Sequence, residues 1–574
     1  MAATTTFKHI PTRPVSLTAE YVREHYQALT DRIASAEASG DSAGWLVLFA
    51  DWNALKSYVG SEGSRIHYAQ SKDMADPKWD AADTYYREQV TPAADNGNSA
   101  VVNALLASRH KDAIATRYGR HLIRTLETSV EPLAPINSDL RVKESDLVNQ
   151  YDKLVATGEI AVNGKTVTLA VARSLQSSED AATRRAAFEG YRSWFLQHRE
   201  AIAGIYHQLV ALRDQMGRNL GHANFIPLGY LGMGRTDYGP AEAATFRAGV
   251  RQYAVPLQKA LNERQAAAYA TPTLAPWDVE YDPALSLPSG IVPVGSQLDK
   301  AQRIFDGLSP KLGGHFSQMR RDGLIDLENR KGKRAGAFCT SFSDEGKVAI
   351  FCNSTGDPDD VSTLMHEMGH AFQASESQVI ETVDQQWPTS DAAEVHSMGM
   401  EYLSMRHMGE FFTQAQADRF RSLRWKHGVE LICYISIVDE FQHWVYENPT
   451  AAIDERDAAW RRIWDVYKPG IDFSGVEDYK HARWYAQGHL FWSPFYYIDY
   501  AVAETGAMQL ALVDAADHDR AMEAYLTLCQ IGGTKSVLEI FGAAGLRSPF
   551  DPDLMRDLMT HAAKELGVAS VVDA

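Results

Sequence analysis

Cysteine is scarce in this sequence. The 574 residues contain four cysteines, Cys339, Cys352, Cys433 and Cys529, and no two of them form a CxxC pair. Scattered cysteines of this kind are most often buried thiols. We therefore expect reduced cysteines; a disulfide across a hairpin between Cys339 and Cys352 is the alternative.

Long apolar runs and dense basic runs are also missing. No stretch approaches the roughly 18 uncharged apolar residues that cross a bilayer, and the N-terminal MAATTTFKHIPTRPVSL has no apolar signal-peptide core. The formal net charge of −18 argues against nucleic acid and anionic membranes as partners, because both attract clustered Lys and Arg. We expect a cytoplasmic protein with neither partner; its oligomeric state stays unknown.

No low-complexity linker and no fixed-period repeat divides the chain. At 574 residues it exceeds the size at which one hydrophobic core stops growing, so two or more lobes are expected. We place the boundary near residue 200, between an N-terminal helical lobe (1–200) and a catalytic helical lobe (201–574). The two lobes are expected to intertwine.

Helical patterns dominate what is present. Apolar residues at three- and four-residue spacing predict helices over 43–68 and 101–128. Asn163-Gly164, between two β-favouring runs, predicts a tight hairpin. A second hairpin is predicted from 336–342 and 347–352, which flank Ser-Asp-Glu-Gly. The fold class is therefore mainly α, with a small β-sheet directly before the segment that carries the chemistry.

Residues 366–370 read His-Glu-Met-Gly-His, an HExxH motif. On a helix, histidines four residues apart lie on one face, so His366 and His370 can bind one ion. Glu367 can hold and deprotonate a water on that ion. The five-residue match alone is expected by chance in roughly a few per cent of chains this long, so its context decides.

The residues before the motif favour the start of a helix. Asp357 suits the N-cap, Pro358 the first helical position and Asp360 the first turn. A helix over 358–375 would follow the predicted strand directly and hold both histidines near its middle. A strand followed by a capped HExxH helix is what a zinc peptidase needs. The structural alternative is two surface histidines beside an unrelated glutamate.

A catalytic zinc site needs a third protein ligand, and a carboxylate from a later helix is usual. Residues 388–401 predict such a helix, on which Glu394 and Glu401 share one face. Either could bind the metal while the other orients a ligand histidine. His396 points to another side and is expected to be a packed or surface histidine.

The segment HARWYAQGHLFWSPFYYIDY (481–500) combines histidine with several tyrosines. His489, Tyr496 and Tyr500 can share one helical face despite Pro494. Imidazole and phenol donors suit the oxyanion that forms during peptide hydrolysis. The adjacent Tyr497 leaves the register open, and an aromatic core stripe is the structural alternative.

HEMGH, followed 24 residues later by EVHSMGME, resembles the oligoendopeptidase F branch of the thimet oligopeptidase family of zinc metallopeptidases. Gly369 within the motif also matches the family form. The resemblance implies Glu394 as the third zinc ligand and Glu401 as a second-shell residue that supports the site. Spacing alone left that choice open. The resemblance is strongest over residues 336–510.

The same resemblance implies oxyanion-stabilising roles for His489 and Tyr496, with Tyr500 as a second candidate. It also implies a large two-lobed helical fold with a deep central channel. Such a channel admits short unstructured peptides and excludes folded proteins. Substrate peptides are therefore the expected partners, and their backbone could pair along the edge of the strand 347–352.

These features together predict a zinc metalloendopeptidase with one Zn²⁺ per chain. It would hydrolyse short oligopeptides through a metal-activated water, with Glu367 as the general base. Cobalt or manganese could stand in for zinc. Two alternatives remain: a zinc carboxypeptidase or dipeptidyl carboxypeptidase of related helical fold, and a non-catalytic peptide-binding protein. The sequence does not indicate side-chain preference.

Overall fold

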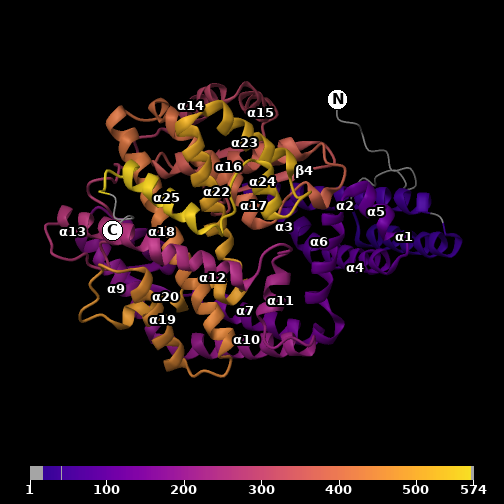
Figure 1. Ribbon diagram of the computed structural model, residues 1–574, viewed down its shortest axis with the longest axis horizontal. Helices are drawn as coiled ribbons and strands as arrows, with labels where there is room; N and C mark the ends of the chain where they lie inside the picture. The colour runs from indigo at the N-terminus through magenta and orange to yellow at the C-terminus, as the bar shows by residue number, and fades with distance from the viewer. Residues whose placement is uncertain (1–16, 41, 570–574) are drawn as a thin grey trace. The chain divides into compact units, whose positions relative to one another are not determined.

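Most of the chain is helical, which confirms the mainly α prediction. The computed structural model describes residues 17–40 and 42–569, and Figure 1 labels the elements along the chain. The residues gather into two compact units, each built from three separate stretches. Unit 1 comprises residues 1–130, 288–413 and 506–546; unit 2 comprises residues 131–287, 414–505 and 547–574.

The predicted boundary near residue 200 falls in the first stretch of unit 2. That position lies within the helix α10 (Arg199–Asn219). The sequential lobes 1–200 and 201–574 stay a prediction.

The helices of unit 1 include those expected over 43–68 and 101–128. The second pattern is divided among three helices: the first ends at Ala107, and Gly119, with a positive φ of 97°, ends the second. The helices are α1 (Ala19–Ser39), α2 (Ser42–Lys72), α3 (Pro77–Tyr85), α4 (Thr91–Ala107), α5 (Lys111–Tyr118), α6 (Arg120–Val130), α14 (Val294–Leu308), α15 (Pro310–Arg321), α16 (Asp359–Ser377), α17 (Ser390–Ser404), α23 (His518–Ile531) and α24 (Val537–Ala543).

Unit 2 contains α18, the longest helix in the described residues. One further helix, α22 (Ile498–Ala516), begins in the residues of unit 2 and ends in those of unit 1. The helices of unit 2 are α7 (Ser138–Ala156), α8 (Leu169–Ser174), α9 (Ala181–Gln197), α10 (Arg199–Asn219), α11 (Ile226–Gly232), α12 (Pro240–Gly249), α13 (Val255–Ala268), α18 (Gln414–Glu447), α19 (Ile453–Tyr467), α20 (Asp478–Tyr485), α21 (Gly488–Trp492) and α25 (Pro552–Glu565).

The predicted tight hairpin lies in unit 2 and is confirmed. Strands β1 (Glu159–Val162) and β2 (Lys165–Thr168) pair antiparallel. Asn163 and Gly164 connect them with positive φ angles of 50° and 74°, which asparagine and glycine tolerate best.

The second predicted hairpin is also confirmed and lies in unit 1. Strands β4 (Phe338–Phe342) and β5 (Lys347–Ser354) pair antiparallel, and β5 packs against α16. A third strand, β3 (Ile325–Glu328), pairs parallel with the other side of β5. It was not predicted, because its sequence, Ile-Asp-Leu-Glu, is short and half acidic. The sheet order is β3-β5-β4.

This order corrects the predicted substrate pose. Residues 347–352 belong to β5, the central strand, whose two edges are already paired with β3 and β4. A peptide backbone therefore has no open edge to pair with on that strand.

All four cysteines are free thiols. Cys339 lies opposite Ile350 in the β4–β5 ladder, so the register does not place it directly across from Cys352. Burial raises the pKa of the Cys352 thiol, which keeps it protonated at neutral pH.

In residues 17–40 and 42–569, none of the helices combines the length and the apolar character that a membrane crossing requires.

Candidate metal centre

The helix α16 that carries the HExxH motif starts one residue later than predicted. It begins at Asp359, and the Asp357 side chain does not cap it. Asp357 instead accepts a hydrogen bond from the Gly290 backbone N–H at 2.9 Å. Asp360 closes the turn before the helix, because its carboxylate accepts the backbone N–H groups of Thr355 and Gly356 at 2.9 and 2.6 Å.

Helix α17 crosses α16 in near backbone contact. A Cβ added to Gly369 would lie 2.4 Å from the carbonyl oxygen of His396 and 2.6 Å from the Cα of Ser397. Real Cβ atoms do not approach so closely, so glycine is required at this crossing. The Tyr525 hydroxyl, from α23, donates to the same His396 carbonyl at 3.2 Å. The close crossing is what brings Glu394 to the two histidines.

His366, His370 and Glu394 converge on one point in unit 1. One potential ligand atom from each lies within 4.8 Å of the other two. The Glu394 Oε2 is 3.4 Å from His366 Nε2 and 3.5 Å from His370 Nε2. Ligands about 2.1 Å from a tetrahedral ion are about 3.4 Å apart. The spacing of these atoms therefore fits a tetrahedral divalent cation.

Glu401 and Ser397 form hydrogen bonds with two members of this cluster, His366 and Glu394. Glu401 Oε1 lies 2.8 Å from His366 Nδ1, which turns the opposite ring nitrogen, Nε2, toward Glu394. The Ser397 hydroxyl donates to Glu394 Oε2 at 2.8 Å. Of the two glutamates that the helical spacing had left open, Glu394 faces both histidines and Glu401 contacts His366 on the other side of its ring.

The electrostatics of the cluster favour a positive charge. Burial alone would lower the pKa of His366, but the carboxylates of Glu394 and Glu401 outweigh it and raise that pKa to about 10. Burial opposes ionisation of Glu394 too, yet the two histidines hold its pKa well below its usual range. A cation among these ligands would take the place of the imidazole protons.

Glu367 lies between His366 and His370 in the sequence, and one of its carboxylate oxygens makes no hydrogen bond within the described residues. Its side chain is buried, and this oxygen is Oε2. Burial raises its pKa. A buried carboxylate oxygen without a partner is costly, and such groups are typical of sites that receive a ligand or water.

The structure shows where His396 lies and places a further residue, Trp387, beside His370. His396 is fully buried, and its Nδ1 donates to the Ala393 carbonyl at 3.1 Å; burial lowers its pKa to about 4. The Trp387 ring lies 5.5 Å from the His370 ring and is 42% exposed. Sequence reasoning missed Trp387, because it lies in the loop before α17, where no periodicity indicates direction.

The three predicted oxyanion residues lie in unit 2, but they do not share one helical face. Helix α21 ends at Trp492, and Phe495, just after Pro494, adopts a positive φ of 66°. The chain therefore turns sharply before α22 begins. This corrects the predicted continuous face: a proline together with a left-handed residue breaks the helix.

The turn nevertheless gathers the same side chains. The rings of His489 and Tyr496 are stacked with centroids 5.8 Å apart, and the Tyr496 hydroxyl donates to the Tyr500 hydroxyl at 2.9 Å. Tyr497 is also close, with its ring 4.5 Å from that of His489. Contacts within unit 2 thus group His489 with all three tyrosines.

His489 is held in one protonation state. Burial and then the charge of Arg483 lower its pKa to about 4, so the ring is neutral at pH 7. The Tyr434 hydroxyl donates to Gln487 Oε1 at 2.6 Å, which leaves the amide nitrogen of Gln487 to donate to His489 Nδ1 at 2.9 Å. Nδ1 is then an acceptor, and the hydrogen lies on Nε2, ready to be donated.

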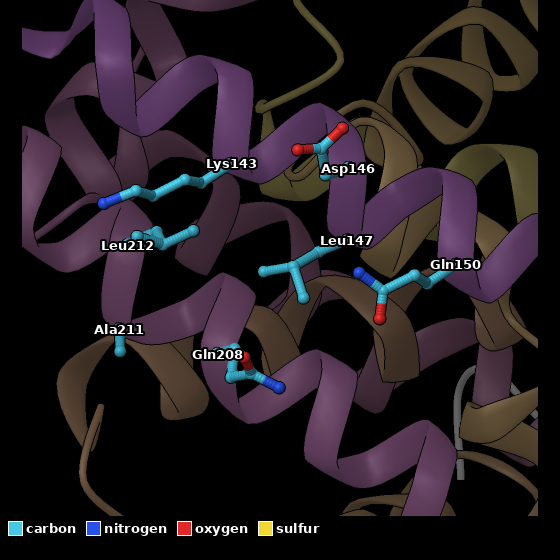
Figure 2. Close-up of a pocket in the computed structure, with 7 residues that line it drawn as sticks. All are labelled: Lys143, Asp146, Leu147, Gln150, Gln208, Ala211 and Leu212. Atoms are coloured by element: carbon cyan, nitrogen blue, oxygen red, sulfur yellow. The ribbon is translucent and has the colours of Figure 1, made fainter.

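A pocket of about 460 Å³ lies elsewhere in unit 2, between α7 and α10. Figure 2 shows Leu147 and Leu212 among its lining residues, with Lys143 and Gln150 beside them. It contains no histidine, cysteine or pair of carboxylates. Its lining residues do not form a ligand set for a metal, so we do not expect metal-dependent catalysis in this pocket.

Comparison with known families identifies the chain. The model of peptidase family M3 matches residues 174–560, and the model of the peptidase M3 N-terminal domain matches residues 14–132. The chain belongs to peptidase family M3. This confirms the resemblance read from the HEMGH motif and the helix that follows it.

Individual proteins similar to this M3 family member are also peptidases by name or assignment. An oligoendopeptidase F homolog from Borreliella burgdorferi is 23% identical over 282 residues, a match that spans 46% of this chain and 46% of that protein. A structure of PZ peptidase A with an inhibitor is 30% identical, with a TM-score of 0.86 over 98% of this chain and 99% of the other. A protein assigned as an oligoendopeptidase F from Bacillus anthracis str. Ames is 28% identical, with a TM-score of 0.81 and full coverage of both chains, 100% each.

Proposed function

We propose that this M3 family member is a zinc metalloendopeptidase that hydrolyses short oligopeptides. The observation that carries the proposal is the convergence of His366, His370 and Glu394 at tetrahedral spacing, beside the unpartnered carboxylate of Glu367. Family membership and the similarity to an oligoendopeptidase F homolog support a peptidase.

The donor set fits zinc. Two imidazole nitrogens and one carboxylate oxygen are a usual ligand set of catalytic zinc, and a fourth position stays open for water. Glu401 supports His366 as a carboxylate that accepts the ring hydrogen on Nδ1. When bound, the cation supplies Lewis acidity that activates water and polarises the peptide carbonyl.

The protein residues divide the remaining work. Glu367 is proposed to take the proton of the attacking water and to deliver it to the leaving amine. Its raised pKa, caused by burial, suits a group that must hold a proton briefly at neutral pH. His489, through Nε2–H, and Tyr496, through its hydroxyl, are proposed to donate to the oxyanion. Tyr500, bonded to Tyr496, is the second candidate.

Substrate backbone pairing is proposed at β4 instead of β5. In the described part of the sheet, β4 pairs on one side only, with β5. Its other edge offers backbone groups to an extended peptide. A structure with a bound peptide analogue checks this: absence of backbone contacts to Phe338–Phe342 would remove the idea.

Replacing Glu367 by Gln tests the general base. The variant should retain about one zinc per chain, because Glu367 is not a ligand, while hydrolysis of a quenched peptide falls about 10³-fold. Glu410→Gln, which removes a carboxylate paired with Arg303 near the surface, is the matched control and should leave the rate unchanged. Normal turnover by Glu367→Gln would refute the assignment.

The alternatives differ in where and whether they cut. An endopeptidase cleaves a peptide of about ten residues that is acetylated and amidated at its ends, whereas a carboxypeptidase or dipeptidyl carboxypeptidase needs the free C-terminus. Mass spectrometry of the products locates the cut. A non-catalytic peptide-binding protein would bind the peptide and release it intact, with or without zinc.

A further inference from the structure

Three arginines of unit 2 form a cluster without an ion-pair partner. They are Arg173 on α8, Arg192 on α9 and Arg483 on α20. None of the three forms a salt bridge or a hydrogen bond with the residues that the structure describes. The protein carries a net charge of −18, so positive groups left without an acid are unexpected.

Arg192 is the clearest case. It is only 8% exposed, and its Nε and Nη1 atoms are buried without any hydrogen-bond partner in residues 17–40 and 42–569. Several other buried arginines of unit 2 are paired with an acid: Arg213 with Glu144, Arg235 with Asp499 and Arg424 with Glu504. Arg456 is the exception, but its Nη2 donates to the Pro449 carbonyl at 3.1 Å. A buried cation without a counter-charge is costly unless something else provides that charge.

The neighbours of Arg192 add positive charge. Burial, and then the charge of Arg483, lower the pKa of Arg192 to about 9, which leaves it protonated at neutral pH. Arg483 lies over the ring of Tyr434, 4.5 Å from its centroid. Glu280, which is exposed, is the acid whose charge acts on Arg483. No acid acts comparably on Arg192.

The cluster adjoins His489. Tyr434 lies under Arg483 and bonds to Gln487, which in turn bonds to His489. The Tyr497 ring packs between them, 6.0 Å from Tyr434 and 4.5 Å from His489. A chain of side-chain contacts therefore connects Arg483 with His489, the residue proposed to donate to the oxyanion.

We propose that Arg483, with Arg192 behind it and Arg173 beside it, binds a carboxylate of the substrate peptide. The carboxylate is either the free C-terminus or an acidic side chain, since a planar guanidinium binds both in the same way. Arg483 is partly exposed and makes the direct contact, while Arg192 supplies charge from a buried position. This inference rests on the proposed peptidase function and names a feature of its substrates.

Paired substrates test it. One quenched peptide is made with a free C-terminal acid, the same peptide as its amide, and a third as the amide with a glutamate near the C-terminus. Wild type should cleave at least one carboxylate peptide with kcat/KM about tenfold or more above the plain amide, chiefly through KM. Arg483→Gln and Arg192→Gln should bring that ratio close to one, with each variant compared against its own cleavage of the plain amide. Arg218→Gln, which breaks a surface pair with Asp214, is the control and should keep the ratio.

Each outcome decides. A preference for the acid peptide assigns the C-terminus, and a preference for the glutamate peptide assigns a side chain. Equal rates for all three peptides, or a preference that both arginine variants keep, would overturn the inference and leave the peptidase function standing. If wild type cleaves none of them, the peptidase function fails instead. Binding of the same three peptides to Glu367→Gln, measured by fluorescence anisotropy, then tests the carboxylate site separately from cleavage. Tighter binding of a carboxylate peptide than of the plain amide supports the site, and equal binding contradicts it. This measurement does not need the arginine variants, so it remains usable if one of them folds poorly.

Discussion

The two units carry functional side chains of opposite charge. In unit 1, two imidazoles are surrounded by the carboxylates of Glu367, Glu394 and Glu401. In unit 2, the charge of Arg483 acts on His489, which forms no ion pair with a carboxylate in the part of the chain that the structure describes. A cation is proposed beside the carboxylates of unit 1, and a peptide carboxylate beside the arginines of unit 2. The two histidine groups therefore lie in opposite charge environments.

The two groups also differ in how the backbone holds them. The proposed metal ligands project from two uninterrupted helices that touch at Gly369, so their positions follow from helical geometry. The His489 group is gathered by a sharp turn at Phe495 and by side-chain hydrogen bonds. Perturbing unit 1 should therefore act through metal binding, and perturbing unit 2 through the rate or the substrate.

The largest effect is expected from breaking the ligand set in unit 1. His370→Ala removes one of three ligands, so bound zinc should fall well below one per chain and peptide hydrolysis at least about 10³-fold. Treatment of wild type with a chelator should do the same, and added zinc should restore it. Metal analysis and a quenched-peptide assay measure both. The exposed His427→Ala is the control; full activity in His370→Ala would contradict the proposed ligand set.

The next effect concerns unit 2. Tyr496→Phe deletes a hydroxyl proposed to donate to the oxyanion, so kcat should fall about 10²-fold with zinc content unchanged. Tyr497→Phe is the matched control, since the same hydroxyl is lost from the neighbouring ring. A larger loss in Tyr497→Phe than in Tyr496→Phe would reverse the register of the two tyrosines.

A smaller effect is expected at the helix crossing of unit 1. Gly369→Ala forces α17 away from α16, which should lower the free energy of unfolding by about 2 kcal/mol and weaken zinc binding. Gly542→Ala on α24 is the control, because an added Cβ there meets nothing within 4 Å. Thermal unfolding and zinc titration measure the two consequences. Unchanged zinc affinity in Gly369→Ala would show that the crossing does not position Glu394.

The smallest effect is expected on the pH dependence of the free energy of unfolding, at a carboxylate of unit 1 outside the proposed ligand set. Burial opposes ionisation of Glu376, but hydrogen bonds with His315 and Lys311 outweigh it and lower its pKa to about 2. Because the folded pKa lies below the unfolded value of 4.5, this stabilisation is full above about pH 5 and is lost as pH falls toward 2.

Glu376→Gln should therefore lower the free energy of unfolding by about 1 kcal/mol at pH 7, and by progressively less from pH 5 down to pH 3. Denaturant unfolding of both proteins at several pH values measures the difference. A gap between wild type and variant that stays constant with pH would show that the carboxylate charge is not the stabilising element.

The sequence predicted the elements that depend on local patterns and missed those that depend on contacts between separate segments. The helix that carries His366 and His370, the helix that carries Glu394 and both hairpins could be read from local patterns, because periodicity and turn residues act over a few positions. The strand β3 and Trp387 could not, since their places depend on contacts far along the chain. The continuous face expected for His489, Tyr496 and Tyr500 was wrong at Phe495, whose left-handed backbone no residue pattern indicates.

The interleaving of the two units has a consequence for biosynthesis. Unit 1 draws its last stretch from residues 506–546 and unit 2 from residues 547–574. On a ribosome, neither unit can complete its contacts until nearly all 574 residues have emerged, although α16 and α17 are made much earlier. Helices exposed for that interval must avoid aggregation. Fragments cut near residue 500 should accordingly be poorer starting points for expression than the whole chain.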